Sequence, residues 1–241
     1  MINASPLPLE GACNVRDLGG YKTKNTKTKY HAFLRSNKLR DITKDDRRYL
    51  LQYGVQCVID LRSQLEKTNE PDNIRGFPVE YAHIPFRDFV YEAYSREEDV
   101  ELFTVYKNLL DLCKNEIRAV FKKMAQYPEK TVLFHCSAGK DRTGVISMLL
   151  LSLCDVQKED ILRDYEVTEF YLSAIVKRKK EEWQSRGKVL PKYVYSSERG
   201  ALEKTLCYLQ NRYNSAYNYL HKNCGISNDT LQIIKNKLLC N

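Results

Sequence analysis

The sequence predicts an α/β fold in which a mainly parallel central sheet is flanked by helices and followed by a helical C-terminal extension. Three short apolar runs, at residues 55–61, 79–86 and 131–135, have the length and composition of strands, and longer helical patterns lie between and after them. Strands that alternate with helices favour a parallel sheet. The 241 residues fit a single domain over 1–241, in which about 156–241 form the helical extension, a candidate lid.

The first elements are an extended segment, a short helix and a buried strand. Residues 21–31 alternate lysine with threonine or tyrosine, as in a solvent-facing hairpin or extended loop. Thr43 and Asp46 have the spacing of a capping box, and Gly54 stands where helix C-termini favour glycine. We therefore expect a short helix between them, followed by the strand at 55–61.

One long amphipathic helix is predicted over about residues 97–127. Apolar side chains recur there at spacings of three and four, and Pro128 ends the pattern. After the third strand and a short polar loop, a leucine-rich apolar run predicts another helix. Beyond Asp155 the pattern stays helical to the end of the chain, with interruptions at Gly187 and Pro191.

Composition excludes several classes of protein but selects none. The 39 lysines and arginines exceed the 31 aspartates and glutamates, which gives a net charge of +8 and favours anionic partners of any kind. Four consecutive cations at 177–180 precede Glu181 and Glu182, which could pair with them along a helix. A solvated face is therefore expected there, and no nucleic-acid partner. No run approaches the roughly 18 apolar residues of a transmembrane segment.

The eight cysteines are dispersed, and no two of them form a C-x-x-C pair. A disulfide scaffold is therefore not expected, and a reducing compartment, the cytoplasm, fits best. The amino terminus lacks the basic and then apolar layout of a secretory signal. Export without a cleaved signal stays open as an alternative.

The segment with the most chemical information is HCSAGKDRTG, residues 135–144, between the third strand and the next helix. The chain between Cys136 and Arg142 is long enough to curl into a bowl whose backbone N–H groups point inward at a helix N-terminus. Such a bowl binds a phosphate dianion. The expected phosphate-binding residues are Ser137, Ala138, Gly139, Lys140, Asp141 and Arg142.

Each polar side chain of this segment has an expected role. Arg142 would clamp two phosphate oxygens with its planar fork, which lysine lacks. The positive field of the bowl favours the thiolate form of Cys136, which would attack the phosphorus in line. Thr143 would hydrogen-bond the thiolate or assist phosphate release, and His135 would brace the loop.

Other interpretations of the segment fail on detail. A nucleotide P-loop needs glycine where Phe134 stands, and serine or threonine where Asp141 stands. A zinc site would have only the adjacent pair His135 and Cys136 as ligands. A thioredoxin-like site lacks its second cysteine. A purely structural turn is the plain alternative.

HCSAGKDRTG resembles the signature loop of the cysteine-dependent protein tyrosine phosphatases. Residues 14–21, NVRDLGGY, resemble the N-F-R-D-L-G-G-Y motif of their atypical bacterial branch, which includes enzymes active on phosphotyrosine and on phosphoinositides. Residues 33–36 and 60–63 match that branch as well, as does the tail over 208–239. The similarity covers nearly the whole chain.

The resemblance implies a phosphatase fold and a two-step reaction that needs neither metal nor cofactor. Cys136 forms a phosphocysteine, and water then hydrolyses it, while one carboxylic acid protonates the leaving group and later activates the water. Phosphate, sulfate or vanadate would occupy the pocket. The implied function is hydrolysis of phosphate monoesters, chiefly protein phosphotyrosine. The alternatives are phosphoinositide or dual-specificity Ser/Thr activity and a phosphate-binding adaptor with slow turnover.

Two aspartates compete for the role of the acid. Asp141 matches the aspartate that the atypical branch is thought to use. It is preferred over Asp88, which follows a strand like the mobile-loop acid of other tyrosine phosphatases but lacks the W-P-D tripeptide.

Three further residues are expected around the bowl. Arg16 and Asp17 would support it, Asp17 through an ion pair or an amide contact, and the alternative is a turn fixed by the two glycines that follow. Lys140 would add a second cation at the rim, which the resemblance links to substrates such as phosphoinositides. The alternative for Lys140 is an ordinary surface lysine.

Overall fold

The computed structural model describes residues 6–95 and 100–240. Its five-stranded sheet has the order β1-β2-β5-β3-β4, in which β1 pairs antiparallel with β2 and all other pairs are parallel. The predicted α/β class with a mainly parallel sheet is therefore confirmed. The strands are β1 (Arg16–Asp17), β2 (Phe33–Ser36), β3 (Val55–Asp60), β4 (Glu80–His83) and β5 (Thr131–His135).

Side chains of the central strands alternate between two apolar layers. Phe33 and Phe134 lie in the larger layer, whereas Leu34 and Leu133 lie in a smaller one. The smaller layer includes Leu50 of α1 (Lys44–Gln52). The larger layer includes residues of α4 (Leu102–Leu112), α5 (Lys114–Ala125), α6 (Asp141–Leu153), α7 (Lys158–Tyr171), α10 (Arg199–Tyr213) and α12 (Asn228–Leu238).

The short helix before β3 begins as its sequence predicts. The Thr43 hydroxyl accepts a hydrogen bond from the Asp46 N–H at 3.1 Å, and the Asp46 carboxylate accepts one from the Thr43 N–H at 2.9 Å. Gly54, just past the helix, has a φ of +99°. Residues 21–31 fold back on themselves as a hairpin, with an antiparallel bridge between Lys22 and Lys27, and Thr28 forms a second bridge with Leu239.

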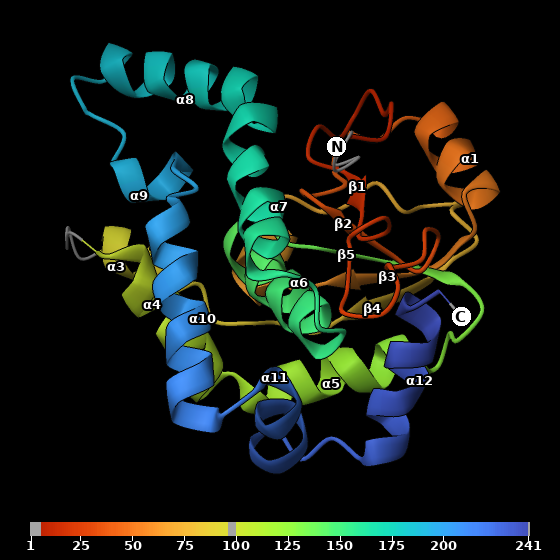
Figure 1. Cartoon of the computed structure of the whole chain (residues 1–241). Helices are drawn as coiled ribbons and strands as arrows, with labels where there is room; N and C mark the ends of the chain where they lie inside the picture. Colours follow the sequence, from red (N-terminus) through yellow and green to blue (C-terminus); the bar gives the residue numbers. More distant parts are fainter. Residues whose placement is uncertain (1–5, 96–99, 241) are drawn as a thin grey trace.

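The long helix predicted over about 97–127 is wrong in one respect, because two helices occupy the span. α4 ends at Leu112 and α5 begins at Lys114, and Cys113 between them has φ −108° and ψ 33°. The apolar stripe runs through this bend, so periodicity could not reveal it. The bend lets α4 pack against α10 while α5 packs against α12 (Figure 1). Residues 97–99 lie outside the described residues.

The part of the chain after α6 is helical, as predicted. Figure 1 shows α8 projecting from the body of the molecule, while α12 lies beside α5. In the ranges that the structure describes, no helix is long and apolar enough to cross a bilayer. The remaining helices are α2 (Gln64–Asn69), α3 (Phe89–Ser95), α8 (Ser173–Ser185), α9 (Lys192–Tyr195), α11 (Ala216–Asn218) and the π-helical turn η1 (Tyr219–Asn223).

Candidate active site

The carboxyl ends of four parallel strands meet at one edge of the sheet. In register, their last residues are Ser36 of β2, His135 of β5, Asp60 of β3 and His83 of β4. Cys136 follows β5 directly, and α6 starts at Asp141. The loop 136–140 therefore joins a strand end to a helix N-terminus, which is where an α/β sheet binds anions.

The loop is fixed by contacts to its own backbone. Gly139 has a φ of +70°, and a Cβ at this position would lie 2.5 Å from the carbonyl oxygen of Ser36, so a side chain does not fit. Asn14 Nδ2 donates to the Ala138 carbonyl at 3.0 Å, and Arg35 Nη2 donates to the Gly139 carbonyl at 2.7 Å. These two donors hold the loop carbonyls in place.

The backbone N–H groups of residues 137–143 are the unusual feature of the loop. None of them donates a hydrogen bond to another residue in the described part of the chain. Such N–H groups at a helix N-terminus carry partial positive charge and need an acceptor. The loop therefore offers a set of donors suited to the oxygen atoms of a phosphate group.

Cys136 and Arg142 lie together at this loop. Cys136 is 2% exposed. Burial alone would lower the pKa of Arg142, but hydrogen bonds to Glu66 and the nearby charges of Asp88 and Cys136 raise it. The guanidinium therefore stays positively charged close to the cysteine sulfur.

Glu66 is a site residue that the sequence patterns did not single out. Its carboxylate accepts hydrogen bonds from Arg142 Nη1 at 2.6 Å and Nη2 at 2.8 Å, and it also accepts one from the Ser137 hydroxyl. Burial would raise the pKa of Glu66, but the hydrogen bonds and charge of Arg142 lower it. A signal was available, because Ser63 and Glu66 form a capping box at the start of α2, just after β3.

Asp88 reaches the same guanidinium from the turn before α3. Its Oδ2 lies 3.4 Å from Arg142 Nη2, and its Oδ1 accepts a hydrogen bond from the Tyr91 N–H at 3.0 Å. Burial raises the pKa of Asp88, with help from the charges of Glu66 and Asp141, and the charge of Arg142 opposes the shift only in part. The structure thus places beside the loop a carboxyl that keeps its proton to a higher pH than an ordinary aspartate does.

Asp141 is held by a buried tyrosine pair. The Tyr106 hydroxyl donates to Asp141 Oδ1 at 2.8 Å and is also hydrogen-bonded to the hydroxyl of Tyr165. Burial raises the pKa of both tyrosines, so both hydroxyls keep their protons. Asp141 is therefore fixed at the first position of α6 by a permanent donor.

Lys140 corrects the expectation of a rim cation or a surface lysine. Its side chain is fully buried, and Nζ donates to the backbone carbonyls of Tyr193, Val194 and Ser196 at 2.8, 3.2 and 3.0 Å. These three acceptors match the three protons of an ammonium group. Lys140 ties the loop to the segment around α9, and its charge points into the protein.

Arg16 supports the loop indirectly. Its Nε donates to Asp164 Oδ1 at 2.9 Å, and Arg35 binds the other oxygen of that carboxylate. Burial alone would raise the pKa of Asp164, but Arg16 and Arg35 lower it to about 2. Arg16 also donates to the side chain of Asn14. Both of the residues that hold the loop carbonyls, Asn14 and Arg35, thus depend on this ion-pair cluster.

Asp17 does not brace the bowl as expected. Its carboxylate accepts hydrogen bonds from the Gly19 N–H at 2.7 Å, the His31 N–H at 2.8 Å and the Tyr53 hydroxyl at 2.7 Å. Successive residues of a strand point to opposite faces, so Asp17 is directed away from the cluster that Arg16 joins. Asp17 fastens the turn after β1 to the end of α1, which agrees with the alternative of a local turn.

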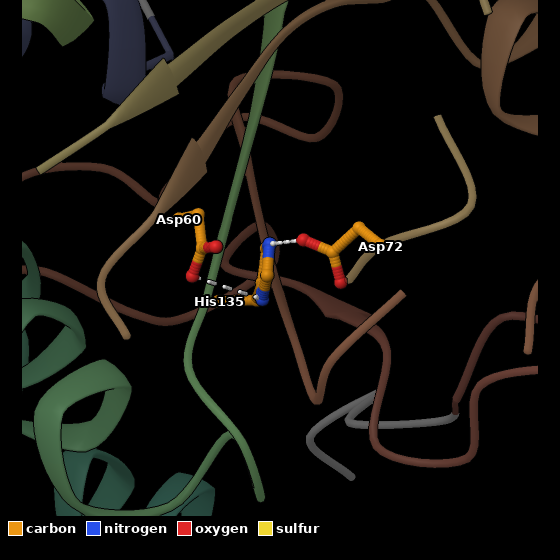
Figure 2. Close-up of side chains that lie close together, drawn as sticks. All are labelled: Asp60, Asp72 and His135. Atoms are coloured by element: carbon orange, nitrogen blue, oxygen red, sulfur yellow. Dashed lines mark ion pairs between the residues drawn. The ribbon is translucent and has the colours of Figure 1, made fainter. Parts of the chain in front are cut away.

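His135 lies between two carboxylates at the start of the loop (Figure 2). Its Nε2 is 3.1 Å from Asp72 Oδ2, without the alignment of a hydrogen bond, and its Nδ1 is 3.9 Å from Asp60 Oδ1. Nδ1 also lies 3.2 Å from the Cys136 carbonyl oxygen. Arg62 Nη2 contacts both carboxylates, at 2.8 and 2.7 Å. Because the Arg62 guanidinium already binds both carboxylates, the cluster fits an internal charge network better than a metal site.

Thr143 has a buried hydroxyl with no hydrogen-bond partner among the residues that the structure describes. A buried hydroxyl of this kind usually finds a partner. Thr143 follows Arg142 in the first turn of α6. Its hydroxyl is therefore available to a sulfur or a phosphate oxygen at the loop.

Comparison with known proteins shows the family. Residues 7–240 match the model of the tyrosine phosphatase family, so the chain belongs to that family. A tyrosine-protein phosphatase of Nostoc commune is 31% identical over 222 residues, which cover 86% of this chain and 74% of the relative. The resemblance to the atypical bacterial branch and the implied enzyme class, protein-tyrosine phosphatase, are confirmed.

More distant similarities cover smaller parts of the chain. A Cupriavidus necator protein whose name includes tyrosine-protein phosphatase is 29% identical over 170 residues, which cover 66% of this chain and 61% of that protein. The chain thus spans less than two thirds of this second relative. The crystal structure of P. aeruginosa TpbA shares 16% identity, with a TM-score of 0.37, over 59% of this chain and 72% of its own.

Proposed function

We propose that this protein hydrolyses phosphate monoesters, chiefly phosphotyrosine in proteins, through a phosphocysteine on Cys136. The observation that carries the proposal is the position of Cys136 beside Arg142 and the unpaired N–H groups of residues 137–143. These donors would hold the nonbridging phosphate oxygens and stabilise the charge of the transition state. The sulfur would then face the phosphorus on the side opposite the leaving oxygen.

The reaction has two displacement steps. The Cys136 thiolate forms a bond to phosphorus while the bond between phosphorus and the phenolic oxygen breaks, and the acid gives its proton to that oxygen. Water then attacks the phosphocysteine, the acid residue takes a proton from the water, and the sulfur–phosphorus bond breaks. Inorganic phosphate leaves, and the thiolate is restored. The buried hydroxyl of Thr143, which has no partner among the described residues, would stabilise the departing thiolate.

The environment of Asp88 supports it as the acid more strongly than the sequence did. Burial raises the pKa of Asp88 beside Arg142, which supports it as a proton donor to the leaving group. Asp141 remains the alternative, since it lies in the loop and is held by Tyr106.

Substrate class and compartment are also part of the proposal. Lys140 points into the protein, so it gives no support to a preference for phosphoinositides. We therefore prefer phosphotyrosine over phosphoinositides, and the match to the tyrosine phosphatase family supports phosphotyrosine over phosphoserine or phosphothreonine. All eight cysteines are free thiols, which supports a reducing compartment such as the cytoplasm.

Phosphate release from a matched panel tests the proposal. The panel contains a phosphotyrosine peptide, a phosphoserine peptide of the same sequence and phosphoinositides, with the Cys136→Ser variant as the blank. We expect the highest kcat/KM on phosphotyrosine, inhibition by vanadate and no release by the variant. Turnover that survives Cys136→Ser would overturn the mechanism, and binding without release by the wild type would indicate an adaptor.

A further inference from the structure

A groove runs from the phosphate-binding loop along α8. It has a volume of about 120 Å³, and Ser137 and Ala138 of the loop form one end of it. This volume corresponds to about four water molecules and is below the range of about 300–1,000 Å³ of small-molecule pockets. It suits one side chain of a larger ligand. The apolar residues that line it are Leu172, Ile175, Val176, Leu190, Val194 and Tyr195.

The wall of the groove is attached to the loop. Lys140 donates to the carbonyls of Tyr193 and Val194, so this wall cannot move independently of the residues that would bind phosphate. On its other side, Lys180 Nζ lies 4.0 Å from the centroid of the Tyr195 ring, which holds this ring against α8. The groove is therefore connected to the phosphate-binding loop by hydrogen bonds.

The rim of the groove carries positive charge without a partner. Lys38 and Glu70 both line the groove and neutralise each other. Lys179 also lines it and forms no ion pair within the described ranges. The predicted pairing of the 177–180 cations with Glu181 and Glu182 is not found there, because Glu182 pairs with Arg186.

Of the four consecutive cations of α8 at 177–180, only Lys179 lines the groove. Lys177 does not line the groove and lies beside a different hollow.

We propose that this groove binds the part of a substrate protein that flanks the phosphotyrosine, with one aliphatic side chain in the groove and an acidic residue against Lys179. The inference rests on the proposed function, because the groove opens from the phosphate loop. An extended peptide could reach it directly from a phosphate bound at residues 137–143. A membrane surface fits less well, because Ile175 and Val176, apolar residues of α8, line the groove and are only partly exposed.

Matched phosphotyrosine peptides test the groove. Three peptides of equal length differ in the residues that flank the phosphotyrosine: the first has glutamate and leucine, the second has only serine, and the third has lysine. Para-nitrophenyl phosphate serves as a substrate without flanking residues. We expect the wild type to favour the glutamate–leucine peptide. Lys179→Glu should lower the ratio of kcat/KM between the glutamate–leucine and serine peptides roughly fivefold, through lost attraction and added repulsion. Ile175→Ser should lower the same ratio, because the leucine side chain of the peptide would lose an apolar contact in the groove.

Lys177→Glu is the matched control, since it makes the same charge change on the same helix outside the groove. No residue of α8 is buried, so these variants leave the core intact. The proposed role of the groove would be wrong if Lys179→Glu left the ratio of kcat/KM between the two peptides unchanged. An equal effect of Lys177→Glu on that ratio would also contradict it. A larger effect on phosphoinositide vesicles than on peptides would assign α8 to a lipid surface instead. Failure of the wild type on para-nitrophenyl phosphate and all peptides would reject the proposed function itself.

Discussion

The carboxyl groups of Glu66 and Asp88 both contact the guanidinium of Arg142, but Glu66 binds it more closely. Glu66 takes both short hydrogen bonds and keeps a lowered pKa, whereas Asp88 stays at 3.4 Å with a raised pKa. Neighbouring carboxyls with pKa values pushed apart commonly divide acid and positioning roles. On this geometry we expect Glu66 to orient Arg142 and Asp88 to supply the proton.

The Asp88→Asn variant tests this division of roles. We expect kcat on phenyl phosphate to fall about 100-fold, because an amide cannot protonate a poor leaving group. The loss should be much smaller on para-nitrophenyl phosphate, whose leaving group needs little protonation. In the wild type, activity that requires protonated Asp88 is lost as the pH rises through its raised pKa, and this basic limb should disappear in the variant.

Asp141→Asn is the direct comparison for that measurement. It should reduce kcat on phenyl phosphate less than Asp88→Asn does and should leave the basic limb in place. The reverse ranking of the two variants would return the role of the acid to Asp141.

The phosphate-binding loop depends on a backbone conformation that only glycine adopts without clash. Gly139→Ala should destabilise the protein by about 1–3 kcal/mol and abolish most activity, because its positive φ is strained and the added Cβ meets the Ser36 carbonyl. Gly76→Ala is a matched control, with a φ of +73° and no atom within 4 Å of the added Cβ. It should cost about 1 kcal/mol and leave kcat/KM unchanged. Thermal unfolding and kcat/KM measure both effects, and equal losses of activity would contradict the assignment.

The elements that the sequence predicted are those with local signals. The capping box at Thr43 and the apolar run of β5 each consist of residues that are close together in the sequence, and both appear in the structure where expected. The bend at Cys113 lacks such a signal, because its cause is the separate packing of α4 and α5 on distant helices.

The same distinction applies to the site. Cys136, Arg142 and Gly139 were identified because one short segment contains them. The position of Lys140 could not be foreseen, since its partners are backbone carbonyls of residues more than fifty positions later, which leave no mark on side-chain chemistry. Asp164 was missed for a related reason, because its partners Arg16 and Arg35 come from strands far away in the chain.

Across the whole molecule, Asp164 joins the helical extension to the sheet. Its pKa of about 2 lies below the ordinary value of 3.8, so its contribution to stability is complete above about pH 4 and is lost as the pH falls through 2. The shift corresponds to about 2 kcal/mol. Asp60, which also has a pKa of about 2, contributes in the same window.

Asp164→Asn should therefore weaken the acid dependence of stability. The variant should lose about 3–5 kcal/mol at neutral pH, because Arg16 and Arg35 are left buried without a counter-charge. Its free energy of unfolding should fall less steeply than that of the wild type between pH 4 and 2. Urea unfolding across this range measures both, with the exposed Asp229→Asn as the control. Identical slopes in the variant and the wild type would contradict the ion-pair argument.

The burial of Lys140 also sets the shortest fragment that can work. A chain cut after α6 would keep every residue of the signature loop but would remove all three acceptors of the Lys140 ammonium group. Of its partners, the ammonium group would then keep only the Asp141 carboxylate, 3.6 Å away. An expression fragment that is meant to represent the catalytic core must therefore extend past Ser196. Trimming the tail to obtain a smaller protein would take away part of the support of the active site.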